Sequence, residues 1–270
     1  MDRNHRIASS AEIRSRAEAA MHRRNKRIAP WAEIRERITD ASPEGLAPID
    51  QLHSEGLAAT RLLAKLARIT TGEKVLDVGC SVGGPARLLA GEFGAVVTGV
   101  DFAGGLIEVA QRLVEVTGIP VTFQCADALQ LPFDDASFDV VWTQHAASAI
   151  ADKPRLYSEI RRVLRTGGRL AMHDLMHGST EGLLYMPVPC ADSEDETFLA
   201  ETGELKSLLS AIGFRELVWH DRTAATKTYS ASPFSIHLIK GEGFPEMLDN
   251  LRRNLQEGRI TVAMGVFQAI

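Results

Sequence analysis

The chain has 270 residues, enough for one large domain with a sizeable core or for two small ones. Its hydrophobic content of 45%, charged content of 24% and formal net charge of -5 are ordinary for a globular protein and give no overall attraction to nucleic acid or anionic lipid. The sequence contains neither a secretion signal nor an apolar run of the roughly 20 residues that a membrane-spanning helix needs. Three scattered cysteines, Cys80, Cys125 and Cys190, favour a reducing compartment, so we expect a cytoplasmic protein.

Residues 1–45 are predicted to form a helical extension in front of one domain, residues 46–270. One helix is expected from Ser9–Ser10 to about Ile28, and Pro30 is placed to open a second one. Apolar side chains recur along both at helical spacing: Ile13, Ala17, Met21, Ile28, Trp31, Ile34 and Ile38. This stripe has to bury against the main domain or another subunit, so a homo-oligomer formed through these helices is one hypothesis. Their basic residues are more typical of a solvated face than of a nucleic-acid interface.

Ser42–Pro43 and Gly45 end this helical pattern, and from residue 74 onward strands alternate with helices. The expected strands are Lys74–Val78, Ala95–Val100, Val121–Cys125, Phe138–Thr143, Leu170–His173, Phe214–Trp219 and Ile260–Phe267. The expected helices are Pro85–Ala90, Leu106–Val116, Lys153–Arg165 and Glu204–Ile212. This alternation predicts an α/β fold with a doubly wound, mostly parallel sheet of about seven strands.

Three acidic residues stand at the ends of three successive predicted strands: Asp77, Asp101 and Asp127. In doubly wound sheets ligands bind at the carboxyl ends of the strands. Taken singly, Asp101 is better explained as a loop residue that caps a helix, and Asp127 as a turn residue. All three together indicate a ligand site.

The loop after the first strand is rich in glycine, which lets the backbone come close to a ligand. A dinucleotide fingerprint would need glycine at position 81, where this chain has Ser81. Asp77 also fits poorly beside a pyrophosphate and suits a ligand with a cationic amino group. A nicotinamide oxidoreductase is therefore disfavoured.

Four segments resemble the successive motifs of class I S-adenosylmethionine-dependent methyltransferases: VLDVGCSVGG, TGVD, CADALQLPFDDASFDVVWTQH and RVLRTGGRLAMHD. The resemblance covers most of residues 50–270. The flanks PIDQLHSEGLAAT, YMPVPCA and NLRRNLQEGRI resemble the small-molecule branch that includes glycine/sarcosine-, quinone- and tocopherol-type methyltransferases. The resemblance implies a Rossmann-like fold and methyl transfer from S-adenosylmethionine, with S-adenosylhomocysteine as product. The acceptor would be a small molecule with an O, N or C nucleophile, in the biosynthesis of a specialised metabolite.

The resemblance also implies a set of cofactor contacts: Asp77, Gly79, Cys80, Gly83, Asp101, Phe102, Asp127, Ala128 and Gln144. Asp77 and the glycines would bind the methionine end and Asp101 the ribose. Phe102 would lie against the adenine, and Asp127 with the Ala128 amide would read its edge. The residues assigned to the substrate pocket are His53, Ser148, Tyr185 and Cys190.

Two departures from the pattern of this branch replace large side chains by small ones. Ser148-Ala149-Ile150 stands where Met-Asn-Ile is frequent, and Pro187-Val188-Pro189-Cys190 stands in place of Pro-x-Pro-Trp. We expect a pocket enlarged for an acceptor bulkier than an amino acid.

His145, just beyond the fourth predicted strand, is the candidate base for an acceptor that must lose a proton. It is equally well interpreted as a residue that only orients the acceptor or caps the loop. His53 is interpreted either as closing over the cofactor or as a surface helix residue. His173 and Asp174 point to opposite faces of a strand, and His177 adds only a weak zinc spacing, so no metal is expected.

Several other functions remain open on the sequence. A nucleic-acid amino-methyltransferase would have an Asn/Asp-Pro-Pro-aromatic run where this chain has Trp142-Thr143-Gln144-His145. An enzyme that binds S-adenosylmethionine but acts as a cyclase is the main alternative, because cofactor motifs do not report on the acceptor site. With a carbon nucleophile, His145 would remove a proton only after methyl transfer, or would have no chemical role.

Overall fold

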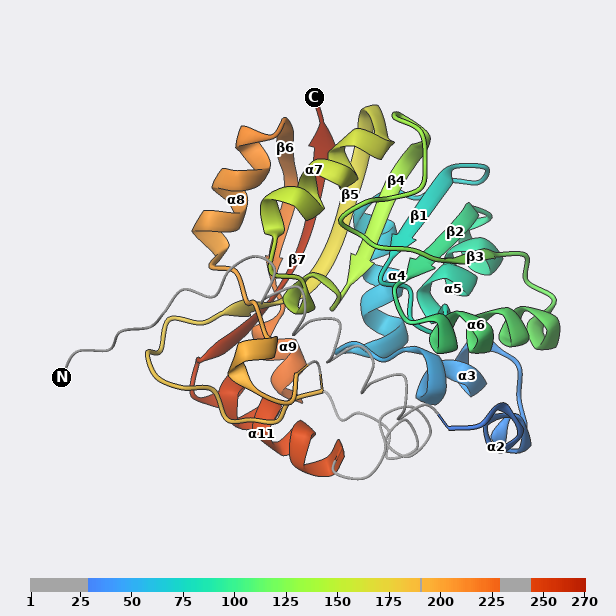
Figure 1. Cartoon of the computed structure of the whole chain (residues 1–270), viewed down its shortest axis with the longest axis horizontal. Coiled ribbons are helices and arrows are strands. Elements are labelled where there is room, and N and C mark those ends of the chain that lie inside the picture. Colours follow the sequence, from blue (N-terminus) through green and yellow to red (C-terminus); the bar gives the residue numbers. More distant parts are fainter. Residues whose placement is uncertain (1–28, 190, 229–243) are drawn as a thin grey trace.

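A computed structural model describes residues 29–189, 191–228 and 244–270, which form one sheet between two layers of helices (Figure 1). The strands are β1 (Lys74–Val78), β2 (Val96–Asp101), β3 (Thr122–Cys125), β4 (Phe138–Gln144), β5 (Leu164–His177), β6 (Phe214–Asp221) and β7 (Ile260–Ala269). Their order in the sheet is β3-β2-β1-β4-β5-β7-β6, and β7 runs antiparallel to both of its neighbours. The predicted doubly wound, mostly parallel sheet of seven strands is confirmed.

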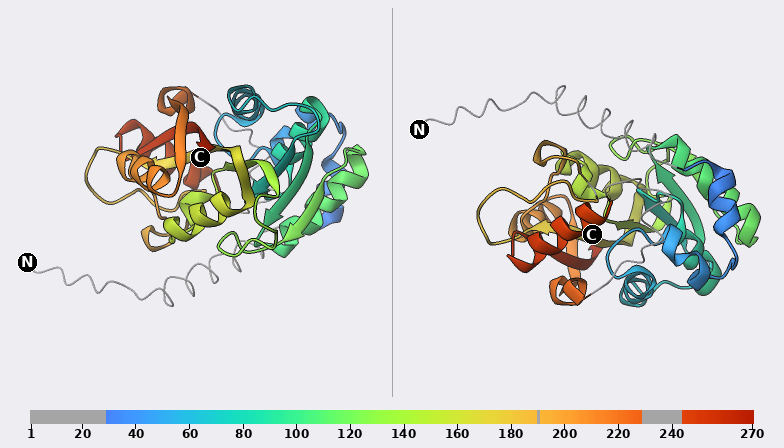
Figure 2. Two further views of the ribbon diagram at one scale, coloured as in Figure 1. Left: turned by 90° about the horizontal axis from the view of Figure 1, so that it is seen from above. Right: turned by 90° about the horizontal axis from the view of Figure 1, so that it is seen from below.

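Helices cover both faces of the sheet (Figure 2). The long helices of the domain are α4 (Gly56–Leu66), α5 (Gly84–Phe93), α6 (Gly104–Thr117), α7 (Lys153–Val163) and α8 (Thr202–Ala211). The first three pack with the core cluster that contains Val75, Trp142 and Met264, whereas α7 and α8 pack with the cluster on the opposite face. Neighbouring strand residues therefore face opposite cores, as the period of two along a strand requires.

The N-terminal part of the described chain contains two short helices, α2 (Trp31–Arg37) and α3 (Pro43–Asp50). Ile34 and Ile38 of the predicted stripe are buried in a cluster with residues of α3 and α6, so the described end of the stripe packs on the main domain. Residues 1–28, with the other predicted helix, lie outside the described residues. A lid role for residues 1–45, and a homo-oligomer formed through them, stay predictions.

Two sequence-based boundaries were wrong. Ser42–Pro43 opens a helix instead of ending the helical region, because the Ser42 hydroxyl accepts a hydrogen bond from the Gly45 amide (3.1 Å) and caps α3. The helix predicted to reach Arg165 ends at Val163, because Leu164 already pairs with Phe138 in the sheet. The glycines at 167–168 thus lie inside β5, beside a shift in its register with β4.

The carboxyl ends of the parallel strands meet at one edge of the sheet, at the bottom of Figure 1. Around this edge lie the segment before α4, the turn η1 (Ala147–Ala149), α9 (Thr223–Thr228) and α11 (Phe244–Gln256). The strand order reverses between β1 and β4, which is where doubly wound sheets bind their ligands. Across the described ranges, no helix has both the length and the apolar character to cross a bilayer.

Candidate active site

The glycine-rich loop between β1 and α5 lies tight against the loop that follows β4. Gly79 has φ 77°, and a Cβ at this position would come within 2.3 Å of the Ala146 Cβ. Ser81 also adopts a left-handed conformation, with φ 52°, which a glycine would adopt at lower cost. The first loop of the site is thus positioned by the fourth strand.

Asp77, at the end of β1, is a buried carboxylate. Among the described residues its Oδ2 atom has no hydrogen-bond partner. Burial, together with the nearby charge of Asp101, raises the pKa of Asp77 to about 8. A buried acceptor atom left unpaired in this way fits a cationic ligand group, as the amino group of S-adenosylmethionine is.

Asp101, Asp127 and Phe102 stand at the next two strand ends. The carboxylate of Asp101 accepts hydrogen bonds from the amides of Ser81 and Ala103 (2.9 Å each), so it joins the first loop to α6. A carboxylate oxygen has two lone pairs, so a ribose hydroxyl is a suitable donor to this group. Asp127 accepts from the Leu129 amide (2.8 Å). The side chain of Phe102 is 39% exposed, as expected for a surface available to a planar ring.

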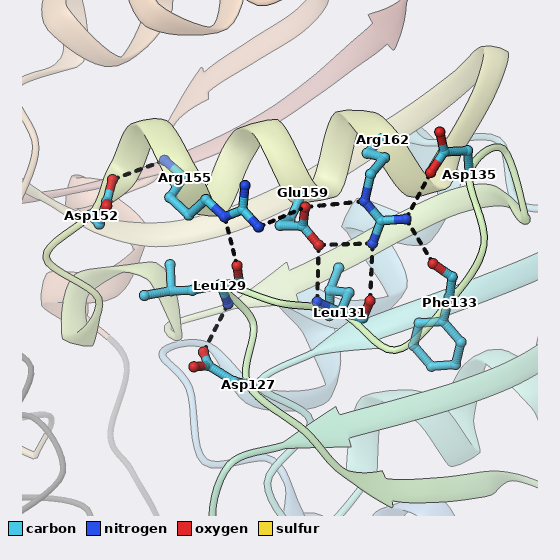
Figure 3. A network of polar contacts seen from close by, with 9 residues as sticks. All are labelled: Asp127, Leu129, Leu131, Phe133, Asp135, Asp152, Arg155, Glu159 and Arg162. Carbon is cyan, nitrogen blue, oxygen red and sulfur yellow. Dashed lines mark hydrogen bonds and ion pairs between the residues drawn. The ribbon is translucent and has the colours of Figure 1, made fainter.

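The segment that follows Asp127 is held by one side of α7 (Figure 3). Glu159 accepts from the Leu131 amide (3.0 Å), and Arg162 donates to the carbonyls of Leu131 and Phe133 (2.9 and 2.7 Å). Arg155 donates to the Leu129 carbonyl (2.8 Å). The loop that carries Asp127 and Ala128 is therefore fixed from the helix, not only from β3.

Gln144, predicted as a cofactor contact, is a buried centre of hydrogen bonds. Its Oε1 atom accepts from the indole of Trp142 (3.0 Å) and from the Thr60 hydroxyl (3.1 Å). Its Nε2 atom lies 3.4 Å from the Nδ1 atoms of both His53 and His173. Gln144 therefore connects β4 to α4 and to β5.

Three histidines meet at the carboxyl edge, from three different parts of the chain. The ring centroid of His145 lies 4.9 Å from that of His173 and 6.1 Å from that of His53. His145 has φ 53° and its amide donates to the His173 carbonyl (2.8 Å). The Ser54 hydroxyl lies 2.9 Å from Nε2 of His145. The sequence placed His145 at this edge, whereas the contact between the three rings follows only from the fold.

His53 and His173 are both neutral at pH 7. Burial lowers the pKa of His53 to about 4. Burial, and next the proximity of His145 and His53, holds the pKa of His173 well below its usual range. His53 is buried, so the surface-helix interpretation was wrong for this residue.

The turn after His145 is fixed by a second set of polar groups. Asp174 accepts from the Ala147 amide (2.8 Å), and burial raises the pKa of its carboxyl to about 6. The Lys153 ammonium donates to the carbonyls of Ala147, Ile150 and Phe198 (2.7, 2.5 and 2.6 Å). Ser148, predicted for the substrate pocket, is buried within this turn.

Tyr185, also predicted for the substrate pocket, lies against the end of α11. Its hydroxyl donates to Glu257 (2.9 Å), and the guanidinium of Arg253 lies 3.6 Å from its ring centroid. Cys190 lies outside the described residues. In the described ranges, no group of three or more His, Cys, Asp or Glu side chains could hold a metal ion.

Several residues that support the site were not predicted from the sequence. They lie in α3, in α5 and in the segment between α3 and α4. Arg87 of α5 forms a buried ion pair with Asp50 (2.7 Å) and donates to the Val82 carbonyl (2.7 Å), behind the glycine-rich loop. Ser54 and Glu55 precede α4 in a segment without periodicity. The signals were the polar run Gln51–Glu55 and the resemblance of the flank PIDQLHSEGLAAT, and neither reveals the partners of these residues.

Comparisons with known proteins agree with this arrangement. Residues 76–172 match the family model of the methyltransferase domain. The chain is 30% identical over 222 residues to 27-O-demethylrifamycin SV methyltransferase of Amycolatopsis mediterranei, a match that covers 78% of each chain. Further curated methyltransferases match over shorter stretches, 31% to 57% of their own lengths.

Two solved structures share the fold over nearly the whole chain. Geranyl diphosphate C-methyltransferase from Streptomyces coelicolor A3(2), in complex with S-adenosyl-L-homocysteine, aligns with a TM-score of 0.69 and 17% identity, over 94% of this chain and 98% of that one. The [4+2]-cyclase SpnF aligns with a TM-score of 0.66 and 23% identity, over 90% of this chain and 97% of that one. At these identities the likeness is one of fold.

The fold, the residues at the carboxyl edge of the sheet and these relatives together define an enzyme that uses S-adenosylmethionine. The chain belongs to the S-adenosylmethionine-dependent methyltransferases, in the group whose curated members act on small molecules.

Proposed function

We propose that this methyltransferase acts on a hydroxyl of a small molecule in the biosynthesis of a specialised metabolite, with His145 as the base. The observation that carries the proposal is the position of the His145 ring, beside the neutral His173 and the Ser54 hydroxyl at the carboxyl end of β4. A base at this point serves an acceptor that must lose a proton. The name of the rifamycin relative, which contains an O-demethylated acceptor, supports an oxygen nucleophile.

For the cofactor we propose the contacts that the family pattern implies. Asp77 would hold the amino group, beside the backbone at Gly79, Cys80 and Gly83. Asp101 would accept the ribose hydroxyls. Phe102, Asp127 and the Ala128 amide would enclose the adenine. The free Oδ2 of Asp77 and the exposed ring of Phe102 support this placement.

We propose that Gln144 supports the cofactor site indirectly, because its side chain orients His53 and His173. His53 and Ser148 would line the acceptor side. The short side chain of Ser148, together with the small residues around it, supports an acceptor bulkier than an amino acid. The free thiols of Cys80 and Cys125 fit the reducing interior of a cell.

In this proposal the protein contributes alignment and proton removal. When bound, S-adenosylmethionine supplies a methyl group on a positively charged sulfur, which is a good leaving group. The loops at Gly79 and Ala146 hold the two halves of the site in contact, so the acceptor oxygen can be placed in line with the methyl group away from water. His145 takes the proton of the acceptor hydroxyl.

The test is to incubate the purified enzyme with methyl-labelled S-adenosylmethionine and a panel of hydroxyl-bearing small molecules, including an extract of its host. We expect label on oxygen in a low-mass product. His145→Ala should lower kcat by roughly 100-fold or more while leaving S-adenosylhomocysteine affinity unchanged. His220→Ala, on the exposed part of β6, is the matched control.

Full activity of His145→Ala would contradict the role of the base, and label on carbon would contradict the oxygen acceptor. Conversion of a substrate into an isomer of unchanged mass, with tight S-adenosylhomocysteine binding and no labelled product, would contradict methyl transfer. That result would establish the cyclase alternative.

A further inference from the structure

The orientation of the Gln144 side chain amide is fixed by a neighbour that can only donate. The indole of Trp142 has an N–H and no acceptor, and it lies 3.0 Å from the Oε1 atom of Gln144. The carbonyl of Gln144 must therefore face Trp142. The amide nitrogen consequently faces the histidines, 3.4 Å from Nδ1 of His173.

This contact selects one tautomer of His173. Because Gln144 donates to Nδ1, that atom of His173 carries the lone pair. The buried ring is neutral, so its single proton is on Nε2. Nε2 of His173 lies 3.4 Å from the Ser54 hydroxyl, to which it can only donate.

The Ser54 hydroxyl has one proton to give and two lone pairs with which to accept. One lone pair accepts from His173, which leaves the proton available for Nε2 of His145, 2.9 Å away. In this arrangement Nε2 of His145 carries the lone pair, and the proton of the imidazole is on Nδ1. Gln144, His173, Ser54 and His145 thus form a chain of hydrogen bonds with one direction.

The position of Ser54 is itself fixed by an ion pair. Its neighbour Glu55 has φ 62° and is buried, and its carboxylate pairs with Arg222 at the end of β6. Glu55 also accepts from the Thr226 hydroxyl of α9 (3.1 Å). The segment that places the serine between two histidines is therefore anchored to the carboxyl end of β6, the outermost strand of the sheet.

We propose that Ser54 is a proton relay for the methyl transfer, passing the acceptor's proton to Nε2 of His145. The proposal rests on the function proposed above. The acceptor O–H proton moves to the Ser54 oxygen as the Ser54 proton moves to Nε2 of His145. The acceptor oxygen bonds to the methyl carbon, and the C–S bond breaks with its electron pair going to sulfur. His145 ends as an imidazolium and Ser54 is unchanged.

The test that does not depend on turnover is nitrogen-15 NMR of the histidine rings in the complex with S-adenosylhomocysteine. We expect neutral His145 to carry its proton on Nδ1 in the wild type and in Ser54→Thr, which retains a hydroxyl. In Ser54→Ala the hydrogen bond is lost, and the proton of His145 should distribute between both nitrogens. A proton on Nε2 of His145 in the wild type would overturn the relay.

Kinetics gives the second measurement. Ser54→Ala should lower kcat by roughly 10- to 100-fold, with a smaller change in KM, and Ser54→Thr should restore most of the rate. An unchanged kcat in Ser54→Ala would also overturn the relay. Absence of methyl transfer in every protein, the wild type included, would contradict the proposed function, whereas unchanged tautomers contradict the relay alone.

Discussion

The carboxylates at the ends of β1 and β2 differ in what they contact, although both stand at the same edge of the sheet. Asp101 has amide donors on both oxygens, while Asp77 has an unpaired, buried oxygen. A buried carboxylate without a cation binds a proton more readily than it does in water. Asp77 is therefore the residue whose charge depends most directly on the ligand.

Substitution of Asp77 by Asn should separate stability from binding. The pKa of Asp77 is raised from its ordinary value of 3.8 to about 8, so the folded protein binds an extra proton across that window and loses stability as pH rises through it. Asp77→Asn should therefore raise the melting temperature of the ligand-free protein more at about pH 9 than at about pH 5. Thermal unfolding at the two pH values measures this difference.

The same variant should bind S-adenosylhomocysteine roughly 10- to 100-fold more weakly, since a hydrogen bond to a charged group contributes about 1.5–3 kcal/mol. Isothermal titration measures the affinity. In the wild type below pH 8, binding should also release a proton, visible as a dependence of the heat on the buffer. Binding of equal strength in the variant would exclude Asp77 from the cofactor site.

Replacement of Gly79 by alanine should lower the stability of the folded protein. An alanine there combines φ 77° with an approach of 2.3 Å to Ala146, which predicts a loss of about 2 kcal/mol or more in the free energy of unfolding. Gly104→Ala is the control, because a Cβ at Gly104 meets nothing within 4 Å. Urea unfolding compares the two, and equal stabilities would contradict the packing described here.

At the scale of elements, the turn η1 depends on one ammonium group. Lys153 gives its three donors to three carbonyls, and burial lowers its pKa to about 8, so it stays charged at pH 7. Lys153→Met should leave these carbonyls unpaired and destabilise the protein by about 2 kcal/mol. Thermal unfolding beside the control Lys65→Met, at an exposed position of α4, checks this. An equally small loss in both variants would show that water replaces the ammonium.

Elements with a strong local pattern were predictable from the sequence. β1 was predicted with its observed bounds, because a short apolar run, now seen to be buried over four consecutive residues, ends at a glycine. α4 and α9 were missed, since α4 follows a polar loop without a cap signal and α9 has only six residues. The residues of the candidate site were predictable to the same extent, that is, where they belong to a local motif. Residues in motifs, such as Asp77 and His145, were found, whereas Glu55 and Arg222 meet only through a tertiary contact between positions 167 apart in sequence.

At the scale of the whole molecule, Glu55 and Arg222 join the N-terminal loops to the C-terminal third. Glu55→Gln should weaken this junction, because a neutral amide cannot form the ion pair. The guanidinium of Arg222, which is partly buried, would then have lost the anion that it pairs with. Hydrogen exchange should become faster at residues 51–60 and 222–228. Arg112→Gln, which removes an exposed pair with Glu115, should leave exchange there unchanged. Faster exchange in neither region would mean that the loop is held by other contacts.

The last strand of the chain lies in the interior of the sheet. β7 pairs with β5 on one side and with β6 on the other, so neither of these strands has its full set of partners until residues 260–269 are present. A chain that stops before residue 260 would therefore expose two unpaired strand edges, one on β5 and one on β6. Closure of the sheet thus depends on residues 260–269, which contain none of the proposed site groups.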